Sequence, residues 1–373
     1  MKPDVDLSKL TVVIPTVSRP LCVTRQFEYW RTTNAQVLIL DGSTGPISIP
    51  QGLKSDNLRY IHTGTPFNHR MSTAQQHIYT EYCIWLPDDE FYLPSGLRSA
   101  IEKLESDTGL LGCSGRTLYF FVDQGRFLTK RGYELERSFP PNPLSATQRF
   151  KCDLPPNKTH KAVFTMFRTA HWNEIFQSAY SNWFYYPYVY ERLLNLKRSS
   201  LGRTEIIEEL FLMRSMEHPP VSTSDLVRDK SVSFLDWATN PQFSEEVSRY
   251  RQAAVDIIRE SGLDLAESRA MEQDLFEANI DFFKTKSSRS SRSLRKRIRA
   301  LVMYLSSKEI RLFAKRHLPN RLLRFSGWAG YDLDAMSSAL QGQKIQFSRS
   351  ELEFVRYLSL KHYWHNQENE KIV

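Results

Sequence analysis

The chain has 373 residues, 41% of them hydrophobic and 25% charged, as expected of a globular protein with two or three domains. No apolar run reaches the roughly 18 residues that a helix needs to span a bilayer. The net charge of +8 is unevenly placed, because residues 284–324 hold fourteen Lys or Arg and one acid. That segment therefore carries +13, and the rest of the chain carries −5.

The N-terminus and the cysteines indicate the compartment. Met1 to Lys9 contains two Asp and leads directly into a short strand, which is not the pattern of a signal peptide. The four cysteines are widely spaced and form no CxxC pair, so we expect reduced, mostly buried thiols. A cytoplasmic protein is the resulting expectation.

The first third of the chain alternates short apolar runs with helical patterns. The runs predict buried strands and the patterns between them predict helices; the strands are expected at 11–15, 36–40, 58–61 and 82–86, and the helices at 21–31, 68–80 and 95–105. Strands that alternate with helices through short connections indicate βαβ units and a parallel sheet.

The rest of the chain is predicted to be mainly helical. A hairpin is expected at 116–129, a Pro- and Asn-rich loop at 139–158 and a flexible Ser- and Arg-rich hinge at 284–293. Helices are expected at 171–181, 188–198, 203–216, 245–260, 265–284, 294–316 and 350–363. We divide the chain into an α/β domain over 1–240, with halves of about 10–115 and 116–240, and a helical C-terminal region over 241–373.

Polar clusters follow three of the predicted strands. Ser18-Arg19 follows the first, Asp41-Gly42-Ser43 the second and Asp88-Asp89-Glu90 the fourth. Ligands of parallel sheets bind beyond the carboxyl ends of the strands, so we expect these clusters to meet. Three consecutive carboxylates also suit a hard divalent cation such as Mg²⁺ or Mn²⁺. The alternative for the triplet is a solvated acidic turn that caps the next helix.

Several common nucleotide-binding and catalytic motifs are absent. The sequence contains no GxGxxG, no GxxxxGK[ST] and no GxSxG, which argues against NAD enzymes, P-loop ATPases and α/β-hydrolases. An Asp after one strand and an acidic triplet after another suit a nucleotide diphosphate, whose charge a divalent ion would neutralise as it departs.

Four segments carry a family resemblance: TVVIPTVSRP at 11–20, Tyr29-Trp30, VLILDGS at 37–43 and YCIWLPDDEF at 82–91. They resemble GT-A nucleotide-sugar glycosyltransferases, and more narrowly a bacterial glycosyltransferase-domain family with YW, DGS and DDDF in this order. The resemblance covers about residues 10–115 and continues loosely to Arg214. It implies a GT-A fold, a Rossmann-like, mostly parallel sheet flanked by helices, here with a C-terminal mainly helical region.

The resemblance also implies roles for individual residues. Asp41 would contact the nucleoside, and Asp88 the ribose or, indirectly, the metal. Glu90 would be the most direct metal ligand, in place of the family's usual third Asp, with Asp89 assisting. Arg19 would lie beside the donor, unless it is only a surface Arg before a helix.

Three further side chains are candidates to bind the phosphate groups of the donor. Arg70 could pair with phosphate, although a solvated helix start explains it equally well. Arg214 and His218 follow a predicted helix; either could bind the diphosphate, and His218 could complete the metal shell.

An inverting transferase needs a carboxylate that deprotonates the acceptor hydroxyl. Glu191 is our first candidate, because its aromatic setting would shield the carboxylate from water and make it a better base. The rival is the predicted helix with Glu205, Glu208 and Glu209, for which a solvated helix face is the simpler interpretation. Aromatic residues that could stack on an acceptor sugar, unless they are core residues, are Trp172, Trp183, Tyr185 and Tyr186.

The basic segment 284–324 could lie on an anionic membrane surface, contact nucleic acid or form a solvated linker. We favour the membrane, because a lipid-linked acceptor would benefit from it. The sequence thus predicts a cytoplasmic, peripherally membrane-associated, metal-dependent glycosyltransferase that moves a sugar from a nucleotide-sugar to a saccharide or lipid-linked acceptor, with inversion as the working hypothesis. The alternatives are a sugar-nucleotide nucleotidyltransferase, a nucleic-acid-binding protein and an inactive glycan-binding relative.

Overall fold

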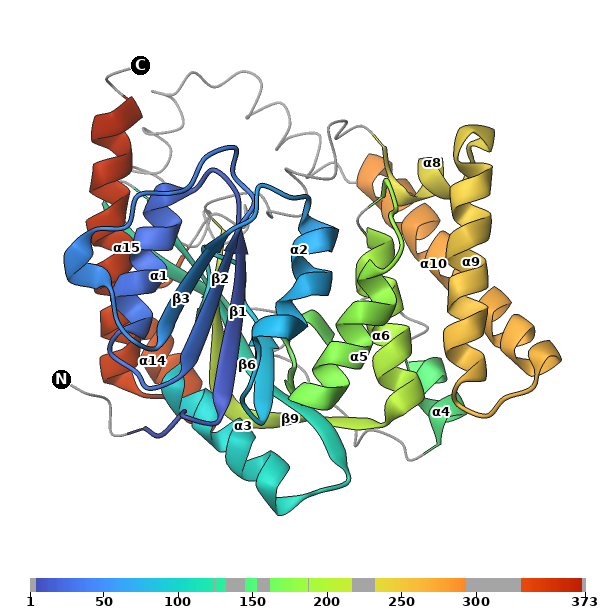
Figure 1. Ribbon diagram of the computed structural model, residues 1–373, viewed down its shortest axis with the longest axis horizontal. Helices are drawn as coiled ribbons and strands as arrows, with labels where there is room; N and C mark the ends of the chain where they lie inside the picture. Colours follow the sequence, from blue (N-terminus) through green and yellow to red (C-terminus); the bar gives the residue numbers. More distant parts are fainter. Residues whose placement is uncertain are drawn as a thin grey trace.

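The computed structural model describes residues 5–123, 125–131, 145–152, 162–186, 188–216, 232–292 and 330–370. Within these residues, nine strands form one mixed sheet (Figure 1). The order across the sheet is β3 (Leu58–His62), β2 (Gln36–Asp41), β1 (Leu10–Thr16), β4 (Tyr82–Trp85), β8 (Met166–Arg168), β6 (Leu110–Asp123), β9 (Arg203–Ser215) and β5 (Phe91–Tyr92), with β7 (Arg126–Arg131) paired to β6.

The strand directions confirm the predicted fold class. Strands β3, β2, β1 and β4 are parallel to one another, and β6 is parallel to β9. Strands β8, β5 and β7 run antiparallel to their partners. The protein therefore has an α/β fold with a mostly parallel sheet flanked by helices, and the predicted hairpin is β6–β7.

The central strands are buried on both faces, which explains their uninterrupted apolar sequence. Every residue of β1 is buried, and alternate side chains enter opposite cores. Val12 and Ile14 join the core on one face, whereas Val13 joins the core on the other. Full burial of each such side chain stabilises the fold by roughly 1.5–3 kcal/mol.

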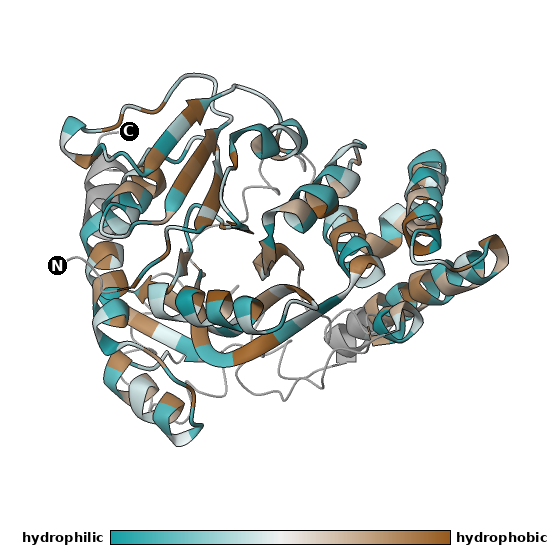
Figure 2. Cartoon of the chain, turned by 60° about the horizontal axis from the view of Figure 1, so that its bottom comes forward, coloured by the Kyte–Doolittle hydropathy of each residue, from teal (hydrophilic) through white to brown (hydrophobic). Residues whose placement is uncertain are grey.

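Helices cover both faces of the sheet (Figure 1). One core is covered by α1 (Pro20–Trp30), α3 (Pro94–Ser106), α14 (Leu333–Gly342) and α15 (Arg349–Glu370). The other core is formed by α2 (Phe67–Thr73), α4 (Ala146–Cys152), α5 (Thr169–Tyr180), α6 (Tyr188–Leu201), α8 (Phe234–Thr239), α9 (Ser244–Arg259) and α10 (Leu265–Arg292). Of these, α8, α9 and α10 pack on α4, on α6 and on one another, away from the sheet (Figure 1). Figure 2 shows that the strands are largely apolar and that the helices carry both apolar and polar residues. Short 3-10 turns lie at Gln51–Leu53, Ala74–His77, Ala162–Phe164 and Pro241–Phe243.

The C-terminal helices α14 and α15 complete the core on the α1 side of the sheet. Phe354 stacks on Tyr29 of α1 with ring centroids 5.7 Å apart, and the Lys361 ammonium donates to the Glu28 carboxylate at 2.7 Å. The Glu351 carboxylate accepts the backbone N–H of Ser95 at 2.9 Å. Helices α9 and α10 contribute to the opposite core together with α5 and α6; the division at 241 stays a prediction.

Several predicted elements were wrong. In place of the helix predicted over 203–216, residues 203–215 form strand β9, because they pair with β6 over most of their length. Residues 284–292 of the predicted hinge are helical, since α10 continues to Arg292. The helix expected over 68–80 ends at Thr73 and gives way to a 3-10 turn, and α4 forms inside the predicted 139–158 loop. The helix predicted at 294–316 lies outside the described residues.

Two predictions, on the cysteines and on membrane-spanning helices, can be compared with the structure. Cys22, Cys83 and Cys113 are buried free thiols, as predicted, and Cys152 is an exposed free thiol. Within the ranges that the structure describes, no helix is both long and apolar enough to cross a bilayer.

Candidate functional site

The three polar clusters meet at the carboxyl edge of the sheet, as predicted. The Thr16 hydroxyl donates to Asp88 Oδ2 at 2.6 Å, and Arg19 Nη1 donates to Asp88 Oδ1 at 2.8 Å. The Ser18 backbone N–H donates to Ser43 Oγ at 2.8 Å, with Ser18 in the left-handed region at φ 52°. The ends of β1, β2 and β4 are thus joined directly by hydrogen bonds.

The acidic triplet occupies a tight, buried turn. The Glu90 backbone N–H donates to the Pro87 carbonyl at 3.2 Å, which closes the turn immediately after β4. Arg19 Nη1 lies 3.5 Å from Asp89 Oδ2, and Arg214 Nε donates to Glu90 Oε1 at 3.0 Å. These ion pairs and their burial exclude the solvated acidic turn that was the alternative interpretation.

Exposure distinguishes the carboxylates of the turn from their arginine partners. The side chains of Asp88, Asp89 and Glu90 are 0%, 7% and 6% exposed, whereas those of Arg19 and Arg214 are 15% and 21% exposed. A ligand that approaches this edge therefore meets guanidinium groups before it meets carboxylates. Guanidinium groups suit phosphate geometry.

Asp88 is a strongly perturbed acid. Burial raises the pKa of its carboxyl group to about 6, while the charge of Arg19 and the Thr16 hydrogen bond act in the opposite direction. A carboxylate kept in such an environment costs folding free energy, which makes Asp88 a candidate functional residue.

Arg214 comes from the end of β9 and lies in an aromatic setting. Its guanidinium carbon is 4.4 Å from the centroid of the Phe164 ring and 5.4 Å from that of Tyr119. Phe164 is in turn stacked on Trp85 at 6.4 Å, at the end of β4. Cation–π contacts of this kind fix the position of the guanidinium beside the acidic turn.

Asp41 is fully buried at the end of β2, and both of its carboxylate oxygens accept hydrogen bonds. Oδ1 accepts from the Ser43 N–H at 2.9 Å and from Ser43 Oγ at 2.5 Å, and Oδ2 accepts from the Tyr60 hydroxyl at 2.5 Å. Burial and the bond to Asp41 raise the pKa of Tyr60 to about 12. The sequence analysis missed Ser43 and Tyr60 as partners of Asp41, although Ser43 belongs to the DGS motif.

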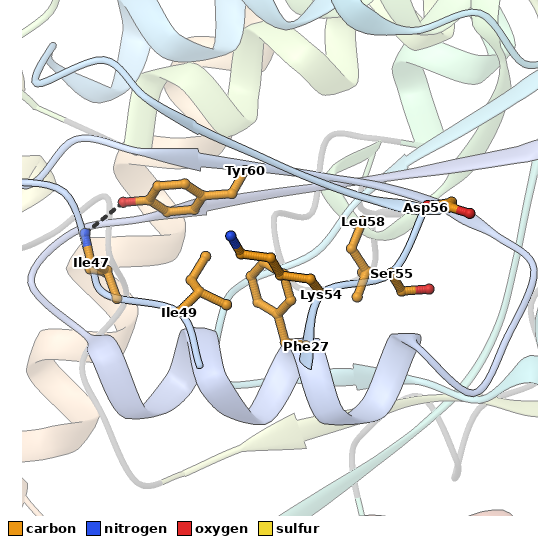
Figure 3. A pocket seen from close by; sticks show the side chains of 8 residues that line it. All are labelled: Phe27, Ile47, Ile49, Lys54, Ser55, Asp56, Leu58 and Tyr60. Atoms are coloured by element: carbon orange, nitrogen blue, oxygen red, sulfur yellow. Dashed lines mark hydrogen bonds between the residues drawn. The ribbon is translucent and has the colours of Figure 1, made fainter. Parts of the chain in front are cut away.

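A pocket of about 550 Å³ lies between α1 and β3 (Figure 3). Tyr60 forms one wall, and its hydroxyl also accepts the Ile47 N–H at 2.7 Å. The remaining lining residues are Phe27, Ile47, Ile49, Lys54, Ser55, Asp56 and Leu58. No residue of the acidic turn lines this pocket, so it is separate from the place where the predicted donor-binding groups meet.

Arg70 does not have the position predicted for a phosphate ligand. It is fully buried, and its Nη1 donates to the Thr65 carbonyl at 2.5 Å. A Cβ on Gly42 would lie 1.4 Å from the same nitrogen, so the guanidinium packs directly on the turn after β2. Arg70 therefore supports the loop after β3 from inside.

Glu191 lies in the first turn of α6 and is exposed. The shielding from water that we predicted for its carboxylate is thus absent, although tyrosines surround the position. Helix α6 begins near the carboxyl edge of the sheet, because Tyr190 stacks on Tyr180, and Tyr180 packs against Phe67 of α2.

The other candidate carboxylates and aromatic residues differ in their contacts and in their exposure to solvent. Glu205 and Glu208 lie on β9 and pair with Lys103 at 3.0 Å and Arg116 at 2.6 Å. Of the four aromatic residues considered for an acceptor sugar, Trp172 is fully buried, Tyr185 and Tyr186 are partly buried, and Trp183 is 50% exposed. His218 lies outside the described residues.

The described residues do not assemble a metal site by themselves. Asp89 and Glu90 offer oxygen ligands suited to a hard cation, but each lies beside an arginine. The described parts of the chain contain no group of three His, Cys, Asp or Glu side chains that could hold a metal ion.

No family model matches the chain, and no curated protein matches it in sequence. Among solved structures, residues 1–349 of S. aureus TarS in complex with UDP-GlcNAc are 12% identical, with a TM-score of 0.44 over 96% of this chain and 92% of that one. The same TarS segment with UDP gives 12%, 0.45 and the same coverage. A longer TarS chain gives 14% and 0.45 over 94% of this chain and 55% of that one. These likenesses are too distant to assign a function.

Proposed function

We propose that the protein is a glycosyltransferase that uses a nucleotide-sugar donor bound at the carboxyl edge of the sheet. The observation that carries the proposal is the pair of partly exposed arginines, Arg19 and Arg214, on a buried turn of three carboxylates. The motif resemblance of residues 10–115 supports the same conclusion independently.

The arginines suit the chemistry of sugar transfer. As the bond between the anomeric carbon and the β-phosphate oxygen breaks, the nucleoside diphosphate gains negative charge. Guanidinium groups already held in place stabilise that charge without reorganisation, which lowers the barrier. The ion pairs with Asp88 and Glu90 keep the guanidinium groups in position before the donor binds.

The acidic residues have separate proposed roles. Asp41 would contact the nucleoside, once the Tyr60 hydroxyl moves or shares the carboxylate, and Asp88 the ribose. Asp89 and Glu90, with His218, would hold a divalent cation that offsets diphosphate charge when bound. Chelation by EDTA before assay, followed by addition of Mn²⁺ or Mg²⁺, tests this role; activity unchanged by EDTA would refute it.

An inverting displacement remains our working mechanism. The acceptor hydroxyl oxygen would attack the anomeric carbon while its proton passes to the exposed Glu191 carboxylate and the nucleoside diphosphate departs. The acceptor would be a saccharide or a lipid-linked sugar, with 284–324 near an anionic membrane surface. NMR of the first-formed anomer decides the mechanism, because retained configuration would remove Glu191 from this role.

The central test is donor binding, measured by thermal shift with UDP-, GDP-, CMP- and dTDP-sugars, each with and without Mn²⁺. We expect one donor to stabilise the protein by about 2.7 kcal/mol at a hundredfold excess over its dissociation constant. Arg214→Lys should weaken that shift because it loses bidentate geometry. Arg98→Met, at an exposed ion pair with Glu102, is the matched control. Absence of any donor-dependent shift would contradict the proposal.

A further inference from the structure

Helix α1 holds the backbone of the acidic turn at three consecutive carbonyl groups. Gln26 Nε2 donates to the carbonyl oxygens of Asp88 and Glu90, at 3.0 and 2.8 Å. Arg25 Nη2 donates to the carbonyl oxygen of Asp89 at 2.9 Å. Two adjacent residues of one helix therefore bind every carbonyl of the triplet.

The donors on α1 are themselves fixed. Gln26 is fully buried, and its Oε1 accepts the Trp30 indole N–H at 2.8 Å, which turns the amide nitrogen toward the turn. The Arg25 guanidinium lies over the Phe91 ring, 5.1 Å from its centroid. One helical turn further on, the Tyr29 hydroxyl donates to the Tyr92 carbonyl at 2.7 Å.

This arrangement determines where the carboxylates point. Fixing three successive carbonyl oxygens fixes the backbone dihedral angles of the turn, and these angles set the directions of its side chains. Without such support, mutual repulsion and the affinity of carboxylates for water would favour a more open turn. Functional groups reach productive geometry only when the residues behind them are locked in this way.

We propose that Gln26 and Arg25 are positioning residues of the donor site, acting through the backbone of the acidic turn. The proposal rests on the proposed function, since it assumes that a nucleotide binds beside this turn. Neither residue needs to touch the ligand.

Two substitutions at Gln26 separate positioning from general stability. Gln26→Glu keeps the size and the acceptor for Trp30, but places a carboxylate oxygen against two carbonyl oxygens. Gln26→Leu removes the hydrogen bonds altogether. The matched control is Asn279→Leu, which removes a buried amide that donates to the Leu275 carbonyl in α10.

Hydrogen exchange and nucleotide affinity are then measured on the full chain, at a temperature where every variant is folded by circular dichroism. We expect faster amide exchange in a peptide covering 86–93 for both Gln26 variants. We also expect dissociation constants for UDP or GDP to rise roughly 10- to 100-fold, by analogy with the loss of metal affinity when the hydrogen-bond partners of metal ligands are removed. Asn279→Leu should change neither quantity.

The possible outcomes separate the two proposals. If the wild type binds nucleotide and the Gln26 variants bind it equally well, the positioning role is refuted while the proposed function stands. Unchanged exchange in 86–93 would also refute positioning. If the wild type binds no nucleotide, the proposed function fails, and the positioning role fails with it.

Discussion

Replacing Asp88 with Asn should stabilise the protein at neutral pH while weakening donor binding. Asp88 is fully buried, and its carboxyl group has a pKa of about 6 in the fold against an ordinary 3.8. Asn keeps the shape of the side chain and an oxygen that can accept from Arg19, while its amide N–H can donate to the Thr16 hydroxyl, but it carries no charge. The substitution thus removes the buried charge with little change in packing.

The magnitude follows from the pKa of Asp88. Because the folded state binds this proton more tightly than the unfolded state, stability is lost as the pH rises from about 4 to about 6 and beyond. At 1.36 kcal/mol for each tenfold change in proton affinity, ionised Asp88 costs about 3 kcal/mol at pH 7. With an unfolding entropy of about 2.1 cal/mol/K per residue, Asp88→Asn should raise Tm by about 4 °C.

Urea unfolding in EDTA, from pH 4 to pH 8, measures this effect. The stability advantage of Asp88→Asn should be full at pH 7 and shrink toward pH 4. Asp107→Asn, at a partly exposed carboxylate paired with Arg203, controls for the loss of one negative charge. An Asp88→Asn protein less stable than the wild type at pH 7, or an advantage independent of pH, would refute the reasoning.

Two further substitutions have matched controls within the chain. Gly42→Ala should destabilise the protein by about 1–3 kcal/mol in urea unfolding, because its Cβ would overlap Arg70, whereas Gly45→Ala has open space and should be neutral; equal effects would contradict the packing argument. Trp183→Ala should change stability by less than about 0.5 kcal/mol and raise the KM for a saccharide acceptor, while Trp172→Ala in the core should cost about 3–5 kcal/mol. An unchanged acceptor KM would exclude Trp183 from acceptor binding.

The N-terminal sheet and the convergence of its polar clusters could be predicted from sequence, because both follow from local rules. Continuous apolar runs mark buried parallel strands, and the carboxyl ends of such strands share one edge. Arg19 and Asp88 could therefore be placed together before any coordinates were known.

Strand β9 and the contacts that surround the acidic turn could not be predicted, because they depend on segments that are distant in the sequence. Residues 203–215 combine good helix formers with apolar spacing compatible with a helix, and only pairing with β6 makes them a strand. The hydrogen bonds from Gln26 to the acidic turn join residues 62 and 64 positions apart and leave no local signature. The ion pair between Arg214 and Glu90 spans 124 positions in the same way.

The docking of α15 on α1 has a consequence for how the chain is made. Glu28 and Lys361 are separated by 333 positions, which takes roughly 15–70 s to synthesise at ordinary translation rates. Throughout that interval Tyr29 lacks the Phe354 ring and Glu28 lacks the Lys361 ammonium that contact them in the folded protein. Strands β1, β2 and β4 are therefore translated long before α15 can pack on α1.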